Sequence, residues 1–151
     1  MLPDEGACRA QWRLAGTKRR FVMADAVSKA PDATGTYDVT EYAAELRAAP
    51  GNHDLGTSLW FENDRVRVFE VRLAPGERGA FHIHDRTYLW TVVETGRGLQ
   101  RFADGTYAIR DYELGDTRFL QHSPASSLIH DLENVGTTTL RFVTVEFRDA
   151  G

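Results

Sequence analysis

Two histidines separated by one residue, His82 and His84, have the type and spacing that most directly indicate chemistry in this sequence. They lie in a stretch, GAFHIH, that reads as a β-strand. Side chains two residues apart on a strand share a face, so both imidazoles would point the same way, with Phe81 and Ile83 packed on the other face. Such a pair suits a metal ion, although two solvent-facing histidines on an antiparallel strand would give the same pattern.

A second block, Gly115–Gly136, adds His122 and His130, so that only His53 of the five histidines stands outside the two blocks. A small antiparallel barrel can bring such blocks face to face, and three imidazoles could then converge on one ion. His130 taken alone favours a buried histidine bonded to a backbone carbonyl, but together with the His-x-His pair it favours a metal ligand. His122 lies next to a Ser-Pro turn and is a candidate rim residue or substrate contact.

The elements that must position these histidines are short strands at intervals of about ten residues, separated by glycine-containing turns. This pattern predicts an all-β sandwich or barrel. Asp104-Gly105 is the strongest hairpin turn. Apolar positions change parity between Val68 and Phe69, which predicts a bulge or a strand buried on both faces. The predicted strands are 57–61, 65–73, 79–84, 87–94, 97–103, 106–111, 117–122, 126–133 and 138–148.

The part of the chain before these strands has two different patterns. Residues 1–35 show no sustained period and end in a turn-rich stretch, so we expect a poorly ordered N-terminal arm and one barrel domain over 36–151. One short helix is predicted from Asp38 to Ala49, with Asp38 as its cap and Glu41 completing a capping-box-like signal. We expect this helix to pack outside a sheet and assign it no chemistry.

Composition limits the classes of function. A chain of 151 residues is long enough for one domain with a sizeable core. Its net charge of −4 gives no overall field that would gather nucleic acid or anionic lipid, and no run of residues is apolar enough for a membrane span. The single cysteine, Cys8, excludes an internal disulfide, which is compatible with the cytoplasm. We therefore expect a cytoplasmic protein with a small-molecule partner and without nucleic acid or membrane partners.

Both histidine blocks resemble the two sequence motifs of the cupin superfamily. The first motif is a glycine, five residues, His-x-His, three or four residues, a glutamate, six residues and a glycine. This sequence matches it at Gly76, His82, His84 and Gly96. The second motif resembles Gly115–Asn134, with Pro124 and a turn before His130. The resemblance covers roughly residues 55 to 148 and implies a cupin-type jelly-roll β-barrel whose ligands point into its mouth.

The motif glutamate is missing. The spacing back from Gly96 lands on Leu89, with Tyr88 just before it, and neither residue is a carboxylate. The resemblance then implies a three-histidine metal site, His82, His84 and His130, similar to that of cupin thiol and diketone dioxygenases. Iron(II) is the first choice for the divalent metal ion, and zinc, manganese, nickel or copper would bind the same ligands.

We therefore expect a metal-dependent small-molecule enzyme, foremost an iron(II) dioxygenase-like oxidoreductase. The alternatives are a redox-neutral metal cupin, such as an isomerase, lyase or cyclase, and a non-catalytic cupin that binds a small ligand, which the missing glutamate would favour. Substrate, reaction type and metal identity do not follow from the sequence, because a fold does not carry a reaction with it.

Several residues around the site are candidates for roles in it. Tyr88 stands next to the vacated glutamate position and is the candidate proton donor, since a phenol can donate to an oxyanion. Gln100 and Trp90 are candidate substrate contacts, although aromatic residues such as Trp90 and Tyr88 more often have a packing role. Three arginines are weaker candidates for binding a substrate carboxylate: Arg78, Arg86 and Arg101. Edge strands and the arm predict a homodimer.

Overall fold

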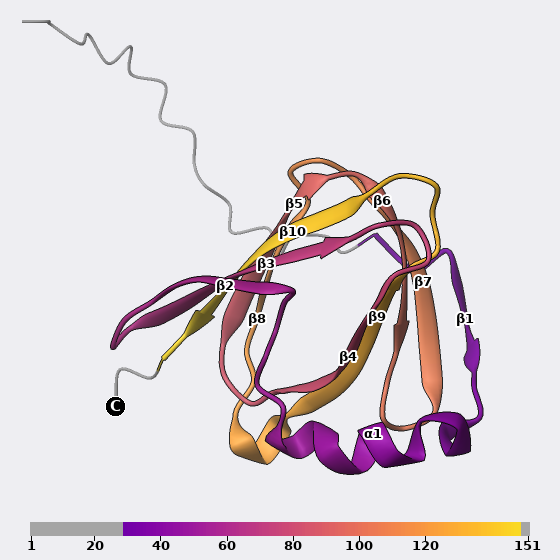
Figure 1. The fold of residues 1–151 in the computed structure, drawn as a ribbon, viewed down its shortest axis with the longest axis horizontal. Helices are drawn as coiled ribbons and strands as arrows, with labels where there is room; N and C mark the ends of the chain where they lie inside the picture. Colours follow the sequence, from indigo (N-terminus) through magenta and orange to yellow (C-terminus); the bar gives the residue numbers. More distant parts are fainter. Residues whose placement is uncertain (1–28, 149–151) are drawn as a thin grey trace, which may run out of the picture.

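Two five-stranded antiparallel sheets face each other in the computed structural model, which describes residues 29–148 (Figure 1). The strand orders are β1-β7-β6-β9-β4 and β2-β3-β10-β5-β8. This architecture confirms the all-β prediction. The strands are β1 (Ala33–Thr36), β2 (Ser58–Glu62), β3 (Val66–Leu73), β4 (Arg78–His84), β5 (Tyr88–Glu94), β6 (Gly96–Arg101), β7 (Thr106–Tyr112), β8 (Thr117–Leu120), β9 (Leu128–Asn134) and β10 (Leu140–Phe147).

All nine predicted strands are present, with ends shifted by no more than two residues. Asp104-Gly105 forms the β6–β7 turn, with Gly105 at a φ of 88°. The predicted arm falls mainly on residues 1–28, which lie outside the described residues. Its last part was predicted wrongly, because Ala33–Thr36 forms β1 and pairs with β7. A tertiary partner for the backbone outweighs the local turn signal there.

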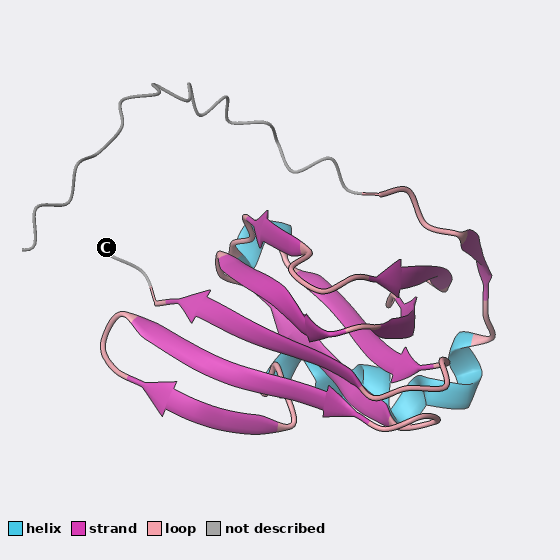
Figure 2. Ribbon diagram, turned by 90° about the horizontal axis from the view of Figure 1, so that it is seen from above, coloured by secondary structure: helices cyan, strands magenta, loops and turns pink. Residues whose placement is uncertain are grey.

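The predicted helix is a run of three short helical segments that crosses one end of the strands (Figures 1 and 2). It begins with a 3₁₀ turn over Val39–Tyr42, continues as α1 (Ala43–Ala48) and ends in a second 3₁₀ turn over Ala49–Gly51. Asp38 caps it as predicted, since its carboxylate accepts the Thr40 N–H at 2.9 Å. No helix of the described residues has the length and apolar character needed to cross a membrane.

A carboxylate on α1 fixes the helix to β4. Glu45 accepts two hydrogen bonds from Arg78, at 3.1 and 2.6 Å, and a third from the Phe81 backbone N–H at 2.6 Å. Arg78 also binds Asp131 on β9 at 3.0 Å, and Arg101 on β6 binds the same carboxylate at 3.1 Å. Asp131 is fully buried, so these bonds lock β4, β6 and β9 in one register.

β3 places apolar side chains on both faces of the second sheet. Val71 and Phe69 face the interior, opposite Phe142 and Thr144 of β10, whereas Val68 faces outward opposite Val145. The outer face of β3 also carries the exposed Arg72, so the strand is not buried on both faces. The predicted irregularity is in the partner strand, where the β2–β3 register shifts between Leu59 and Phe61.

An apolar row crosses the outer face of this sheet. The register places one apolar residue of each of its five strands side by side. We call this set the outer row: Phe61, Val68, Val145, Leu89 and Phe119. Phe61 and Phe119, at its two ends, are 53% and 59% exposed. Solvent-facing aromatic side chains in such a row are typical of an interaction surface.

Candidate metal centre

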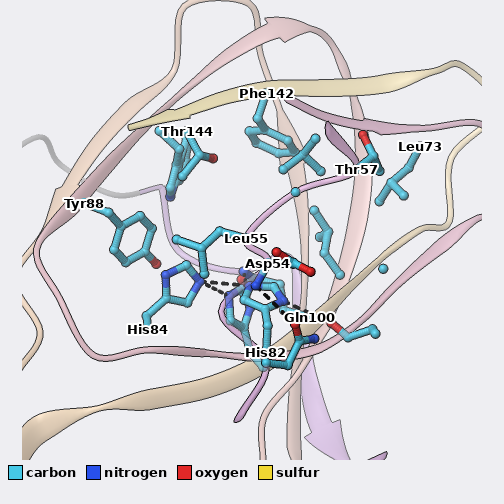
Figure 3. A pocket seen from close by; sticks show the side chains of 18 of the residues that line it. Asp54, Leu55, Thr57, Leu73, His82, His84, Tyr88, Gln100, Phe142 and Thr144 are labelled. Carbon is cyan, nitrogen blue, oxygen red and sulfur yellow. Dashed lines mark hydrogen bonds between the residues drawn. The ribbon is translucent and has the colours of Figure 1, made fainter. Parts of the chain in front are cut away.

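Strand pairing assembles the three predicted histidine ligands. His82 of β4 lies directly opposite His130 of β9, and His84 follows two residues along β4 on the same face. All three side chains are buried and line the cavity of the barrel, and Figure 3 shows His82 and His84 there. They form a histidine group of the described residues that could hold a divalent metal ion.

The spacing of the donor atoms fits one ion. The Nε2 atom of His84 lies 3.0 Å from that of His82 and 2.9 Å from that of His130. Two nitrogens bound at about 2.1 Å and at right angles to each other would be about 3.0 Å apart, against about 3.4 Å in a tetrahedral site. Both separations are short enough for neighbouring ligands of one ion, and the donor atoms of the three histidines all lie within 4.8 Å of one another.

The backbone contact of His82 frees its Nε2 lone pair, and Gln100 lies where it can do the same for His130. His82 Nδ1 lies 3.0 Å from the Ala80 carbonyl oxygen, which can only accept, so the proton is on Nδ1 and Nε2 is free to bind metal. His130 Nδ1 is 3.2 Å from the Gln100 side-chain nitrogen, and a half-turn of the amide would bring its oxygen to that place. Ligation through Nε2 requires His130 Nδ1 to donate, so in the metal-bound protein Gln100 presents its amide oxygen.

Burial keeps these histidines neutral. Loss of hydration lowers the pKa of His82 and, much more strongly, the pKa of His84 and of His130. The neighbouring imidazoles lower the pKa of His84 further. A neutral imidazole is the form that binds a metal ion, so the site need not lose protons to do so at pH 7.

The histidines lie at one end of a cavity of about 260 Å³ inside the barrel. Its walls are mostly apolar and include Trp90, Leu132 and Phe142. The segment from Asn52 to Thr57 borders the cavity and is fixed to the strands, since Asn52 bonds to the Phe81 carbonyl and Thr57 to the Glu70 carbonyl. The site is thus a shaped apolar pocket of the kind that holds small organic molecules.

Tyr88, and not Leu89, is the inward-facing residue at the missing glutamate. Leu89 pairs with the outward-facing Val145 and Phe119, so it points away from the cavity. The motif spacing placed the missing glutamate at Leu89, and this placement was therefore wrong. Tyr88 lines the cavity and stacks on the His84 ring at 4.0 Å between centroids. Burial raises the pKa of its phenol, which keeps it a hydrogen-bond donor.

The other predicted contacts divide into two groups. Gln100 and Trp90 line the cavity, as expected of substrate contacts. His122 lines neither described cavity. Its ring centroid lies 5.9 Å from that of Tyr88 and 6.4 Å from that of His84, and its Nδ1 bonds to the Ser126 carbonyl at 2.9 Å. His122 therefore packs beside both Tyr88 and His84.

The three arginines considered for a substrate carboxylate bind protein carboxylates. Arg78 and Arg101 share Asp131, and Arg86 lies 4.0 Å from Glu146. None of the three lines the histidine cavity or the neighbouring cavity that contains Arg110 and Arg118.

The sequence pattern did not lead us to some of the residues that line the cavity. Tyr112, Phe142 and Thr144 could have been found from the alternation of β7 and β10, whereas Asp54 and Leu55 lie in an irregular segment without such a signal.

The fold and the pocket together define a double-stranded β-helix barrel. A cupin domain from Bordetella pertussis Tohama I is similar, with 24% identity, a TM-score of 0.54 and coverage of 61% of this chain and 91% of that one. An uncharacterized conserved protein with a double-stranded β-helix domain from Klebsiella pneumoniae subsp. pneumoniae MGH 78578 also has 24% identity, with a TM-score of 0.50 and coverage of 76% and 91%. No protein-family model matches the chain, and neither does any curated protein.

This chain therefore has the cupin fold, as its motifs implied, with a three-histidine cluster in the barrel. At this level of identity the likeness establishes the fold alone, so the chemistry has to be argued from the pocket.

Proposed function

We propose that this protein is an iron(II)-dependent dioxygenase-like oxidoreductase acting on a small organic substrate. The observation that carries the proposal is the convergence of three neutral histidine Nε2 atoms at one end of an apolar cavity. Three neutral ligands leave the charge of a dication uncompensated, which favours direct binding of an anionic or chelating substrate. Bound iron(II) would supply electrons to dioxygen at positions that the protein leaves open.

The protein's own residues supply positioning and protons. His82 is oriented by the Ala80 carbonyl and His130 by Gln100, so the ligand set is held before metal and substrate arrive. The apolar walls limit water around the reacting groups and strengthen the electrostatic interactions there. Tyr88 keeps its proton and would donate a hydrogen bond from its hydroxyl oxygen to an oxyanion of the substrate.

A redox-neutral metal cupin, such as an isomerase, lyase or cyclase, remains the second candidate. The same histidines would hold an ion acting as a Lewis acid on a carbonyl or enol, and Tyr88 would act as the proton donor. The feature that favours it is the retained phenol proton of Tyr88, since proton transfer needs no oxidant. A non-catalytic ligand-binding cupin is the third candidate.

Metal analysis separates the enzymes from the non-catalytic protein. We expect protein purified without a histidine tag to hold close to one equivalent of a transition metal, or to take up iron(II) when it is added. Less than about a tenth of an equivalent, unrestored by iron(II), would contradict both enzyme proposals.

Ligand assignment and chemistry need separate measurements. His82→Ala, His84→Ala and His130→Ala should each lose metal, with the surface variant His53→Ala as the control. Oxygen uptake with β-diketones, thiols or phenols would support the dioxygenase. Turnover that consumes no oxygen would support the isomerase, lyase or cyclase.

We further propose that the protein is a homodimer. The outer row offers an apolar surface across five strands, and a two-fold axis through its centre would place Phe61 of each copy near Phe119 of the other.

Iron(II) and a single cysteine are both compatible with the reducing cytoplasm, which we propose as the location of the protein.

A further inference from the structure

A second cavity, of about 380 Å³, adjoins the histidine pocket inside the barrel. Four side chains line both cavities and form the boundary between them: Tyr88, Trp90, Gln100 and Tyr112. A ligand bound at the histidines therefore has a second compartment within its reach. The side chains that line this compartment therefore limit which substrates fit.

Two arginines line this second cavity. Arg118 of β8 pairs in register with Trp90, so it shares the interior face of the sheet. Among the described residues, its guanidinium makes no hydrogen bond or ion pair. Arg110 of β7 donates one hydrogen bond, to the Lys29 carbonyl at 2.8 Å, while its Nε is buried without a partner in the same part of the chain. Both guanidiniums thus have donors available to a ligand.

Tyr112 adds a neutral donor beside the two arginines. It lies two residues from Arg110 on β7 and shares its face, and only 5% of it is exposed. Gly98 lies under its ring, where a Cβ would come within 2.8 Å of it. Burial raises the pKa of Tyr112 to about 12, and Arg110 and Arg118 act in the opposite direction. Both guanidiniums are thus within electrostatic range of the phenol, whose hydroxyl has no hydrogen-bond partner among residues 29–148.

The three acidic residues that line this cavity have partners other than Arg110 and Arg118. Asp111 is bound to Arg97 at 2.7 Å, Asp116 accepts the Glu113 backbone N–H at 2.9 Å, and Glu113 lies 4.0 Å from Lys29. Each acid is engaged with a partner at the rim. Arg118 and the buried Nε of Arg110 line a cavity whose walls also include Tyr88, Trp90 and Phe102.

We propose that the second cavity binds a carboxylate, and that the substrate is a small organic acid with an apolar or aromatic body. Its carboxylate would contact Arg110, Arg118 and Tyr112, its body would lie against Trp90, and its far end would reach the histidines. Guanidinium groups in a partly dehydrated pocket are well suited to carboxylates. The assignment of the far end rests on the proposed function, whereas the carboxylate subsite is a property of the second cavity alone.

Two probes that differ only in charge test this subsite: 3-phenylpropionate and 3-phenylpropanamide. Their binding to chelator-treated, metal-free full-length protein is measured by calorimetry. We expect wild-type protein to bind the acid roughly tenfold more tightly than the amide. Arg118→Gln and Arg110→Gln should remove most of this preference and keep the affinity for the amide. The control Arg72→Gln, on the exposed side of β3, should leave the preference unchanged.

Three results would overturn the inference: no saturable binding of the acid by wild-type protein, equal affinity for acid and amide, or an unchanged preference in the Arg110→Gln/Arg118→Gln double variant. An iron(II) titration of the same proteins tests the proposed function separately. Wild-type protein that prefers the acid but binds no metal would support the subsite and contradict the oxidoreductase. Protein that binds metal but shows no acid preference would support the oxidoreductase and contradict the subsite.

Discussion

Replacing Gln100 tests whether the structure holds a metal site or only a histidine cluster. The Gln100 amide is 3.2 Å from His130 Nδ1. If His130 binds metal through Nε2, its Nδ1–H needs an acceptor, and Gln100→Leu removes it at a nearly unchanged side-chain volume. Outer partners of metal-bound histidines contribute 10- to 100-fold to affinity, which corresponds to about 1.4 to 2.7 kcal/mol. We expect a loss of metal affinity in this range.

Gln100→Glu separates the hydrogen bond from general damage to the pocket. A carboxylate accepts from Nδ1–H more strongly than an amide, so this variant should bind metal at least as tightly as wild-type protein. Anaerobic competition between protein and a chelator for iron(II) gives the affinities. Gln121→Leu, on the exposed connection after β8, is the matched control, and thermal melts of metal-free protein report the fold. Wild-type affinity in Gln100→Leu would refute the reasoning, as would a loss in Gln100→Glu equal to that in Gln100→Leu.

Four further outcomes can be measured. Tyr88→Phe keeps the ring that stacks on His84 but loses the hydroxyl. Turnover should therefore fall about 10²- to 10⁴-fold while the metal content stays full. Unchanged turnover would exclude Tyr88 as the proton donor. The pKa values of the buried histidines are lowered in the folded state, so below a pH of about 6.5 the unfolded chain binds more protons than the folded one. As the pH drops from there, the unfolding free energy of metal-free protein should fall by up to about 1.4 kcal/mol per pH unit for each histidine. A flat denaturation profile between about pH 5 and 7 would contradict this. Asp131→Asn leaves two partly buried arginines without their shared buried charge and should cost roughly 3 kcal/mol in urea unfolding, with a change below about 0.5 kcal/mol counting against the network. Light scattering should give twice the chain mass of 17.0 kDa for wild-type protein and the single mass for Leu89→Lys/Phe119→Lys, and a wild-type monomer would end the dimer proposal.

The strands and the ligand identities were predictable because they depend on local pattern. Alternation of apolar residues and glycine turns located nine strands, and a His-x-His pair must share a face wherever its strand lies. The spacing of both motifs implied the barrel. β1 was missed because its four residues, ATGT, form a strand only by pairing with β7.

Which way a side chain faces was harder to predict, since it depends on pairing. Motif spacing pointed to Leu89, but β5 pairs with β10 and β8 so that Tyr88 faces inward and Leu89 outward. A shift of one residue exchanges the two faces of a strand, and spacing in the chain cannot detect it. The same limit applies to Arg78 and Arg101, whose partner Asp131 is distant in sequence.

The sequence by itself determined that two histidines share a strand face, that a third belongs to a second block, and that the motif carboxylate is missing. These facts depend on residue type and on the two-residue period of a strand. The tertiary structure decided that His130 lies opposite His82, that Tyr88 takes the inward place, and that Arg110 and Arg118 face a cavity beside the site. Each of these depends on long-range strand register, which is set by the packing of the whole barrel and by buried ion pairs between distant strands.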